Sequence, residues 1–468
     1  MNISARPRPM RICGWPGPCH FKASSATLSA TTCEQPTREI QMHKCKALMF
    51  ALLAAALLPV PLLAADDVTV LVAGALIDTV NGTRVSNPVV EIHGDRIVSV
   101  SQDGAIPEGA TVIDLGSATI LPGLADLHTH LTMYSTDNGY QKLGVSETDE
   151  AIRGVVNAHK TLLAGFTAAR NLGARGYSDV SLRNAINDNR VPGPRLQVSG
   201  PALSATGGHC DRNELPKEYA AKAGGVADGP WAVRAKVREN HKYGADVIKI
   251  CVTGGTLSKG TNPGVRQYTY EEVEAIVDEA HTLGMMVAAH AHGTEGILFA
   301  IRAGVDSIEH ASLLDEAGLE LAKRNGTFLS VNAYTPKYTV ENAEQMGIFA
   351  ESLEKARNLA EVRLDTYRKA IKADAKVVFG SDSATYPHGD NAKQFAEYVE
   401  LGMTPMEAIQ SATTIAAESL GWVGDTGAIA PGYLADIIAV KGDPLSDIRE
   451  LENVTFVMKG GEVFKNRE

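Results

Sequence analysis

The chain has 468 residues and a formal net charge of -11, with 44% hydrophobic and 21% charged residues. This composition is globular and excludes a wholly disordered, collagenous or disulfide-dense chain. The acidic balance argues against nucleic acid or an anionic membrane as the main partner, because either would require a basic face. We therefore expect a small-molecule ligand. The length allows two or three domains, or one large barrel with an accessory domain.

The amino terminus reads differently from the rest of the chain. Residues 42–65 begin with a short basic stretch, continue as an apolar run, and end in small residues ahead of two aspartates. This order predicts a signal peptide and a bacterial protein that is periplasmic or secreted. Residues 1–41 are then interpreted as a mis-called extension. A membrane-spanning helix is the alternative, but Pro59 and Pro61 and the shortness of the run disfavour it.

Removal of this leader would leave two cysteines, Cys210 and Cys251, in the mature chain. An oxidising compartment would permit a disulfide between them. The sequence does not show whether the two residues approach each other, so their pairing is left open.

Short β-branched runs separated by turn residues lie near both ends of the mature chain. The first set predicts a small antiparallel sheet, and the last residues repeat the same style. We expect one β-sandwich domain assembled from residues 66–121 and 426–468. It would flank a hydrolase domain over residues 122–425.

Strand-like runs alternate with helical segments through the central part of the chain. The helix expected over residues 270–283 has one apolar face, and Thr269 with Glu272 gives it a capping box. Alternation of this kind predicts an α/β fold, a (β/α)8 TIM barrel, with an open doubly wound sheet as the alternative. The expected strands are 120–128, 167–171, 195–200, 246–251, 285–290, 307–310, 327–332 and 376–382.

Possible metal ligands lie at the carboxyl ends of these strands, where a barrel places its active site. They are His128, His130, Lys249, His290, His310 and Asp382. Residues two apart on a strand share a face, so the first two histidines would both point into the barrel mouth. Any one of the 13 histidines could be an ordinary core or surface residue. Their joint placement at strand ends favours a site for zinc or another divalent metal.

Lys249 lies within an apolar strand, where an unpaired ammonium costs several kcal/mol. One resolution is an ion pair with a carboxylate. The other is reaction of the neutral amine with carbon dioxide, which gives a carbamate able to bridge two metals about 3.5–4 Å apart. The six positions would then form a complete dinuclear site.

The segments LPGLADLHTHL, VIKI, AAHAHG, SIEH, FGSDS and GAIAPGYLADIIAV together resemble the amidohydrolase superfamily of metal-dependent hydrolases. The resemblance runs from about residue 68 to residue 464. It implies that His128, His130 and Asp382 bind the more buried metal. Carboxylated Lys249 would bridge to a second metal held by His290 and His310.

The resemblance also favours hydrolysis over deamination. Deaminases of the superfamily carry a glutamate three residues after the histidine of the fifth strand, where this chain has Gly293. The segments look most like the Xaa-Pro dipeptidase-like group, to which ochratoxin-hydrolysing amidohydrolases are also similar. The substrates implied are dipeptides or N-acyl amino acids with a free C-terminal carboxylate, ochratoxin A among them.

By the same analogy, two divalent ions would polarise the scissile carbonyl and lower the pKa of a bridging water. Zn²⁺ is the expected identity of these ions. Asp382 would take the proton of that water and pass it to the leaving nitrogen. Members of the family often form symmetric assemblies, so we expect a homo-oligomer. No membrane partner is expected once the signal peptide is cleaved.

Further candidate residues follow other strands of the expected barrel. Two of them are catalytic candidates: His209 could hydrogen-bond the developing oxyanion or the substrate carboxylate, and His292 shares a side of its strand with the preceding ligand histidine. Arg266 suits a carboxylate because its donors are forked. Tyr268 and Tyr334 are further substrate-binding candidates. Each of these residues could instead be a loop residue without a role.

Two other functions stay open. A cyclic-amide or lactam hydrolase, similar to imidazolonepropionase or hydantoinase, would use the same kind of metal site. A non-catalytic binding protein would keep the barrel without the chemistry. The intact ligand set and Asp382 argue against that loss, because a decayed site should first lose the groups needed only for reaction.

Overall fold

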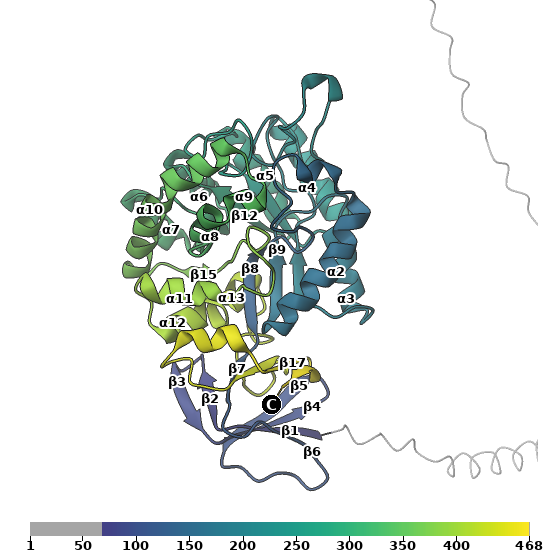
Figure 1. The fold of residues 1–468 in the computed structure, drawn as a ribbon, viewed down its shortest axis with the longest axis vertical. Helices are drawn as coiled ribbons and strands as arrows, with labels where there is room; N and C mark the ends of the chain where they lie inside the picture. Colours follow the sequence, from purple (N-terminus) through teal and green to yellow (C-terminus); the bar gives the residue numbers. More distant parts are fainter. Residues whose placement is uncertain (1–67, 468) are drawn as a thin grey trace, which may run out of the picture. The chain divides into compact units, whose positions relative to one another are not determined.

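The computed structural model describes residues 68–467, from strand β1 (Val68–Val72) to just beyond strand β18 (Glu462–Asn466) (Figure 1). The predicted extension and signal peptide, residues 1–65, lie outside the described residues. Among the helices of the described part, none has both the length and the apolar character needed to cross a bilayer.

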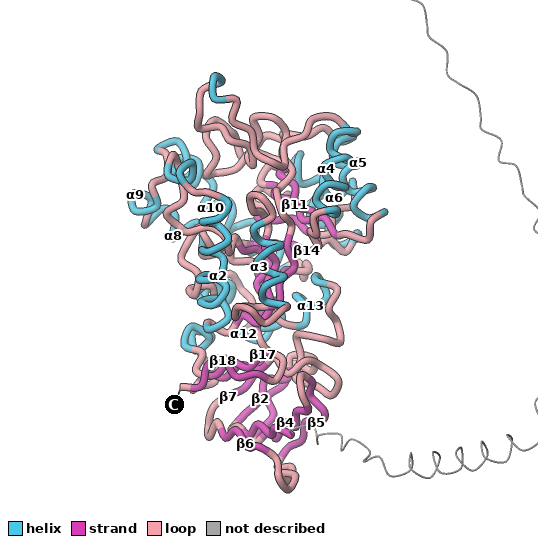
Figure 2. The backbone as a smooth tube through the Cα atoms, turned by 90° about the vertical axis from the view of Figure 1, so that its right-hand side faces the viewer, coloured by secondary structure: helices cyan, strands magenta, loops and turns pink. Residues whose placement is uncertain are grey.

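Strands from both chain ends form two mixed sheets, which Figure 2 shows gathered together. One has the order β5-β4-β1-β6 and the other the order β18-β17-β16-β7-β2-β3. Besides β1 and β18, the bounds are β2 (Ala75–Asp78), β3 (Thr83–Ser86), β4 (Pro88–His93), β5 (Arg96–Gln102), β6 (Thr111–Asp114), β7 (Thr119–Pro122), β16 (Ile437–Val440) and β17 (Phe456–Lys459). The expectation of a purely antiparallel sheet was wrong. Strand β1 lies between β4 and β6 and pairs with β4 in antiparallel but with β6 in parallel, and β2 pairs with β7 in parallel as well.

The two chain ends share one apolar core. Leu121 of β7 lies opposite Ile438 of β16 in an antiparallel pair. Leu71, Ile92 and Met458, which come from both sheets, are buried in the same cluster. Burial of these side chains stabilises the contact between the first and last parts of the described chain.

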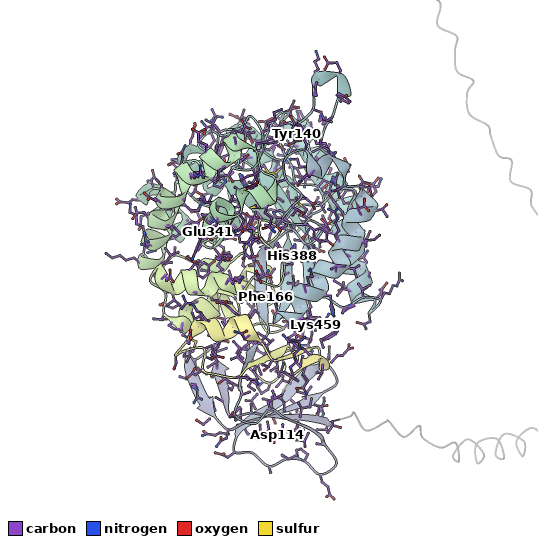
Figure 3. All side chains as sticks on the ribbon, in the orientation of Figure 1. Asp114, Tyr140, Phe166, Glu341, His388 and Lys459 are labelled. Carbon is purple, nitrogen blue, oxygen red and sulfur yellow. A yellow bond between two sulfur atoms is a disulfide. The ribbon has the colours of Figure 1, made fainter. Side chains whose placement is uncertain are left out.

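The central strands form two parallel sheets, which confirms the predicted α/β fold. The orders are β10-β9-β8 and β11-β12-β13-β14-β15. Their bounds are β8 (Leu124–Thr129), β9 (Phe166–Asn171), β10 (Arg195–Val198), β11 (Val247–Cys251), β12 (Met286–Ala291), β13 (Ser307–His310), β14 (Phe328–Val331) and β15 (Val377–Phe379). Between the sheets, the ring of Phe166, labelled in Figure 3, packs 5.4 Å from that of Phe379.

The strand expected over residues 120–128 is in fact two strands, β7 and β8, in different sheets. The break lies at Gly123, whose backbone N–H donates to the carbonyl of Asp436 (2.8 Å). A Cβ at this position would lie 2.1 Å from Oγ1 of Thr167. Glycine therefore allows the close approach at which the chain leaves one sheet for the other.

Backbone hydrogen bonds connect the two parallel sheets at both edges. At one edge, the N–H of Leu203 donates to the carbonyl of Lys249 (2.8 Å). At the other, the N–H of Asp382 donates to the carbonyl of His128 (2.7 Å), and that of His130 donates to the carbonyl of Ser383 (2.9 Å). These bonds bring the carboxyl ends of the first and last parallel strands together.

Helices cover the parallel strands on the outside (Figure 1). Helix α5 begins after Thr269, and Thr269 and Glu272 form the predicted capping box. The helices are α2 (Glu147–Leu163), α3 (Ser178–Asn187), α4 (Pro230–Lys242), α5 (Tyr270–Thr282), α6 (Thr294–Ala303), α7 (Glu316–Asn325), α8 (Thr335–Glu341), α9 (Ala343–Met346), α10 (Ala350–Lys372), α11 (Lys393–Glu400), α12 (Pro405–Ser411) and α13 (Thr414–Leu420). Short 3-10 helices cover Gln141–Gly144, Lys217–Tyr219 and Ile448–Asn453.

Candidate metal centre

Two groups of side chains with metal-binding atoms lie at the carboxyl ends of the parallel strands. In each group the possible ligand atoms lie within 4.8 Å of one another. The groups are His128, His130 and Asp382, and His290, His292 and His310. The structure thus brings together the histidines and the aspartate that the sequence predicted as ligands, and it adds His292 to the second group.

Unusual backbone conformations position two of these residues. His310 has a φ of 74° and Asp382 a φ of 59°, in the left-handed region that side-chain-bearing residues rarely adopt. Each directly ends or closely follows a parallel strand, so the backbone turns where the side chain meets the cavity. Such conformations cost about 1–3 kcal/mol each and are concentrated at functional sites.

In the first group, Oδ1 of Asp382 lies 3.4 Å from Nε2 of His128 and 3.3 Å from Nε2 of His130. Burial opposes ionisation of Asp382, but the two imidazoles and Lys249 hold its pKa below the usual range. Burial and the charge of Lys249 lower the pKa of His128 to about 4. A neutral imidazole beside a carboxylate is the donor set that a divalent metal requires.

In the second group, the rings of His290 and His310 lie 4.6 Å apart and those of His292 and His310 lie 4.7 Å apart. Burial is the main cause that lowers the pKa of all three well below the ordinary value. Nδ1 of His292 lies 2.7 Å from Oγ of Ser312. These imidazoles are therefore neutral and carry lone pairs for a metal.

Lys249 of β11 is buried, and its Nζ has no hydrogen-bond partner in residues 68–467. Burial lowers its pKa to about 8, against the opposing effect of Glu309 and Asp382. Of the two resolutions that the sequence left open, the described residues supply no direct ion pair. An orphaned amine beside two donor groups fits a carbamate with two divalent ions, because each carbamate oxygen would then gain a partner.

Sequence reasoning missed a buried ion pair beneath the first group. Nη2 of Arg170 lies 2.9 Å from Oε1 of Glu309, and Oε2 of Glu309 lies 2.9 Å from Nδ1 of His128. Burial opposes ionisation of Glu309, but Arg170 and His128 hold its pKa below the usual range. The signal in the sequence was one charged residue inside each of two predicted strands, Arg170 in 167–171 and Glu309 in 307–310.

Asp126 is a second buried carboxylate that sequence reasoning missed. It lies two residues before His128 on the same strand. Its Oδ1 accepts from the N–H of Ser381 (2.9 Å) and its Oδ2 from Nδ2 of Asn391 (2.7 Å). These bonds hold the segment that leads to Asp382 against β8. Burial raises the pKa of Asp126 to about 6 despite these hydrogen bonds.

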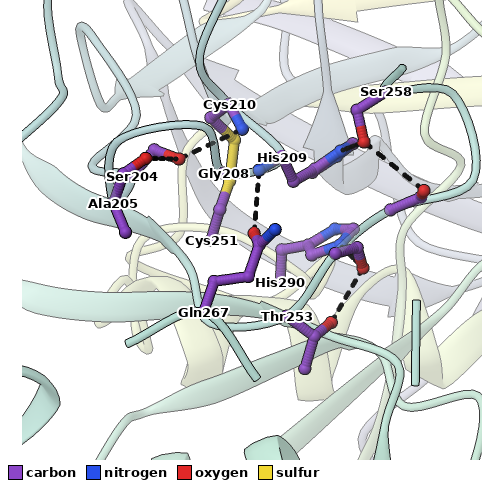
Figure 4. Close-up of a disulfide and its surroundings, with 12 residues drawn as sticks. Ser204, Ala205, Gly208, His209, Cys210, Cys251, Thr253, Ser258, Gln267 and His290 are labelled. Atoms are coloured by element: carbon purple, nitrogen blue, oxygen red, sulfur yellow. Dashed lines mark hydrogen bonds between the residues drawn. A yellow bond between two sulfur atoms is a disulfide. The ribbon is translucent and has the colours of Figure 1, made fainter. Parts of the chain in front are cut away.

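One cavity reaches both donor groups. Among the predicted substrate residues, His209 lines this cavity and stacks on His290 with 4.2 Å between ring centroids. Its Nδ1 lies 2.8 Å from Oγ of Ser258, as Figure 4 shows. His292 also lines the cavity.

The structure does not bring the other three predicted substrate residues to this cavity. Arg266 is half-buried and its Nε lies 3.0 Å from Oε1 of Glu295. The hydroxyl of Tyr268 is buried and donates to the carbonyl of Ala227 (3.3 Å). Tyr334 packs against Tyr386, with 5.0 Å between ring centroids. Position after a strand was the only signal for these residues, and the loops carry them away from the centre.

Cys210 and Cys251 form a disulfide, with their Cα atoms 6.3 Å apart (Figure 4). This answers the question that the sequence left open. The bond joins the loop that carries His209 to the last residue of β11, two residues after Lys249. It thereby holds that loop beside the candidate centre.

Comparison with known proteins agrees with this geometry. The chain matches the Amidohydrolase family over residues 119–464. It is 35% identical to ochratoxinase from Aspergillus niger over 427 residues, which cover 85% of this chain and 87% of that protein. A crystal structure of a Xaa-Pro dipeptidase with bound methionine in the active site is 38% identical, with a TM-score of 0.78, and the match covers 85% of this chain and 100% of that one. A prolidase complexed with N-methylphosphonate-L-proline is 33% identical, with a TM-score of 0.79, and the match covers 86% of this chain and 100% of that one. The chain belongs to the amidohydrolase family, with ochratoxinase and prolidase structures among its relatives.

Proposed function

We propose that the protein is a dinuclear metallohydrolase that cleaves the amide bond of dipeptides or N-acyl amino acids with a free C-terminal carboxylate. The observation that carries this proposal is the buried Nζ of Lys249, which has no hydrogen-bond partner within residues 68–467, beside two groups of possible metal ligands. The relatives named ochratoxinase and Xaa-Pro dipeptidase support the substrate class. Asp382 favours a hydrolase over a non-catalytic binding protein, because its carboxylate can carry the proton that hydrolysis moves.

The proposed scaffold is a closed (β/α)8 barrel over residues 122–425 and a β-sandwich made from residues 66–121 and 426–468. The hydrogen bonds at both edges of the parallel sheets support closure. The core shared by the two mixed sheets supports a sandwich. The strands at the edges of the two parallel sheets would then present their carboxyl ends to the same cavity.

His128, His130 and Asp382 would hold one divalent ion, and His290 and His310 a second, with carboxylated Lys249 between them. Two such ions, Zn²⁺ in our proposal, supply Lewis acidity toward the amide carbonyl and the attacking water. Glu309 holds His128 in the tautomer that leaves Nε2 free. Asp382 accepts a proton on a carboxylate oxygen and returns it to the leaving nitrogen. His209 donates a hydrogen bond toward the substrate oxygen from the cavity wall.

We further propose that the protein is exported and forms a homo-oligomer. A disulfide between Cys210 and Cys251 supports an oxidising compartment, because cytosolic thiols are kept reduced. Sequencing of the mature amino terminus after secretion, with cleavage expected near residue 65, tests the export.

The function is tested with the chain from Asp66, loaded with zinc. Dipeptides, N-acyl amino acids and ochratoxin A are each paired with a C-terminally amidated analogue, and a set of lactams is included. We expect mass spectrometry to show fast cleavage of the carboxylate-bearing substrates and only slow cleavage of their amidated analogues, and a chelator to abolish both. Turnover confined to lactams would establish a cyclic-amide hydrolase instead. No turnover with any substrate would favour a binding protein.

A further inference from the structure

Arg363 is a buried cation in the wall of the cavity. It lies on helix α10, is only 5% exposed, and lines the same cavity as the two donor groups. No carboxylate within residues 68–467 forms an ion pair with its guanidinium, whose one side-chain partner is Oγ of Ser312 (3.0 Å). A buried charge without a counter-ion costs several kcal/mol. An anionic ligand in the cavity would supply this counter-ion.

Helix α10 fixes Arg363 against the second donor group. Tyr367 lies one turn further along the same helix, and its hydroxyl donates to the carbonyl of His310 (2.7 Å). Ser312, which accepts from Nε of Arg363, also lies 2.7 Å from Nδ1 of His292. The guanidinium is thus one side chain away from the candidate metal ligands.

Three other cations near the cavity have partners within the protein. Nζ of Lys142 lies 2.6 Å from Oε1 of Glu214. Arg266 pairs with Glu295 outside the cavity. Lys355 donates to the carbonyls of Ser258 and Thr261 (2.6 and 3.2 Å). Of these side chains, only Arg363 has guanidinium N–H groups available to bind a planar carboxylate with two parallel hydrogen bonds.

We propose, on the basis of the function proposed above, that Arg363 binds the free C-terminal carboxylate of the substrate. In such a substrate, three covalent bonds separate the scissile carbonyl carbon from the carboxylate carbon. The group that holds the carboxylate therefore has to lie beside the reacting centre, as Arg363 does. This role replaces the one that the sequence assigned to Arg266.

The competing role of Arg363 is structural: its hydrogen bond to Ser312 would only hold α10 in place. The two roles are separated by the kinetics of N-acetyl-L-phenylalanine and its C-terminal amide with zinc-loaded R363M. We expect kcat/KM for the acid to fall about 100-fold, mainly through KM, because hydrogen bonds between charged groups are the strong ones. The amide should change less than about threefold. Equal losses for acid and amide, or no loss for the acid, would overturn the proposal.

Two further variants control the comparison. R363K keeps the charge but loses the fork, and we expect it to recover about tenfold of the lost kcat/KM for the acid. R266M removes a half-buried arginine that pairs with Glu295 outside the cavity, and it should leave both substrates within about twofold. If thermal unfolding shows that R363M does not fold, R363K decides, because a structural role would again predict equal losses for acid and amide.

A binding measurement keeps this test independent of catalysis. N-benzyl-L-phenylalanine lacks the scissile carbonyl but keeps the carboxylate, and its amide has the same skeleton. By calorimetry we expect wild-type protein to bind the acid at least about 30-fold more tightly than the amide, and R363M to lose that preference. If wild-type protein hydrolyses nothing but shows this result, the proposed function fails and the carboxylate site stands. Equal binding of the two ligands to wild type, or a preference that R363M retains, overturns the site.

Discussion

Oε2 of Glu309 lies 2.9 Å from Nδ1 of His128, so a buried carboxylate lies against the ring of a candidate metal ligand. Arg170 holds Glu309 from the other side, with Nη2 2.9 Å from Oε1. A contact of this kind sets which ring nitrogen carries the proton, and it leaves Nε2 with a free lone pair.

Substitution of Glu309 by glutamine should therefore weaken metal binding. The variant E309Q keeps the shape of the side chain but removes its charge beside Arg170 and His128. We expect metal affinity to fall about 10–100-fold, as for other residues that orient a ligating histidine. Competition with a chelator, followed by metal analysis, measures the change. The exposed Glu320 of α7 offers the control E320Q, which should bind metal as the wild type does, and equal affinities for the two variants would contradict the orienting role.

Replacement of Lys249 should separate a bridged centre from two independent ones. The variant K249A removes the proposed bridging ligand, so we expect metal content to fall from the two ions per chain expected of the wild type to one or none. Hydrolysis should fall at least about 1,000-fold, because the missing metal supplies several kcal/mol of transition-state stabilisation. A short carboxylic acid should restore part of the activity by occupying the position of the carbamate.

The measurements are metal analysis by mass spectrometry and turnover with and without added propionate. K372A, at an exposed position on α10, is the matched control and should retain full metal content. Unchanged metal content and turnover in K249A would rule out the bridging role.

The sequence predicted the parallel strands and the candidate metal ligands at their ends because both are local signals. A histidine pair two residues apart, or an aspartate at the end of an apolar run, is visible within a few residues. The switch between sheets at Gly123 was missed, because it depends on contact with Thr167 and Asp436. Periodicity cannot show which partner a strand segment will pair with.

Buried charges were harder to interpret from the sequence. Arg170 and Glu309 are 139 residues apart in the chain, and only folding reveals that they are partners. Arg266 seemed better placed than Arg363 because it follows a strand closely. The structure shows the opposite, since Glu295 neutralises Arg266 outside the cavity whereas α10 carries Arg363 into its wall.

The disulfide should contribute strongly to stability. Cys210 and Cys251 are 41 residues apart, and the chain-entropy account gives about 4 kcal/mol for a loop of that size. The double variant C210S/C251S should therefore unfold at a clearly lower urea concentration than the oxidised wild type. Reduced wild type should match the variant. If reductant leaves the wild-type midpoint unchanged, the bond does not contribute as expected.

Buried Asp179 should make stability depend on pH. Burial raises its pKa to about 6 from 3.8, although the N–H groups of Gly200 and Val180 and Nδ2 of Asn171 donate to it. The folded state thus binds the proton more tightly than the unfolded state. The resulting decrease in the free energy of unfolding is absent below about pH 4, grows as pH rises, and is complete above about pH 6. A difference of about two pKa units corresponds to about 3 kcal/mol.

D179N cannot ionise, so its stability relative to wild type should rise by up to about 3 kcal/mol between pH 4 and pH 7. Urea unfolding of both proteins at several pH values measures this difference, and any constant cost of the altered hydrogen bonds cancels from the slope. D188N, at an exposed aspartate near the end of the same helix, should follow the wild type at every pH. A difference between D179N and wild type that stays constant from pH 4 to pH 7 would show that Asp179 has an ordinary pKa in the folded protein.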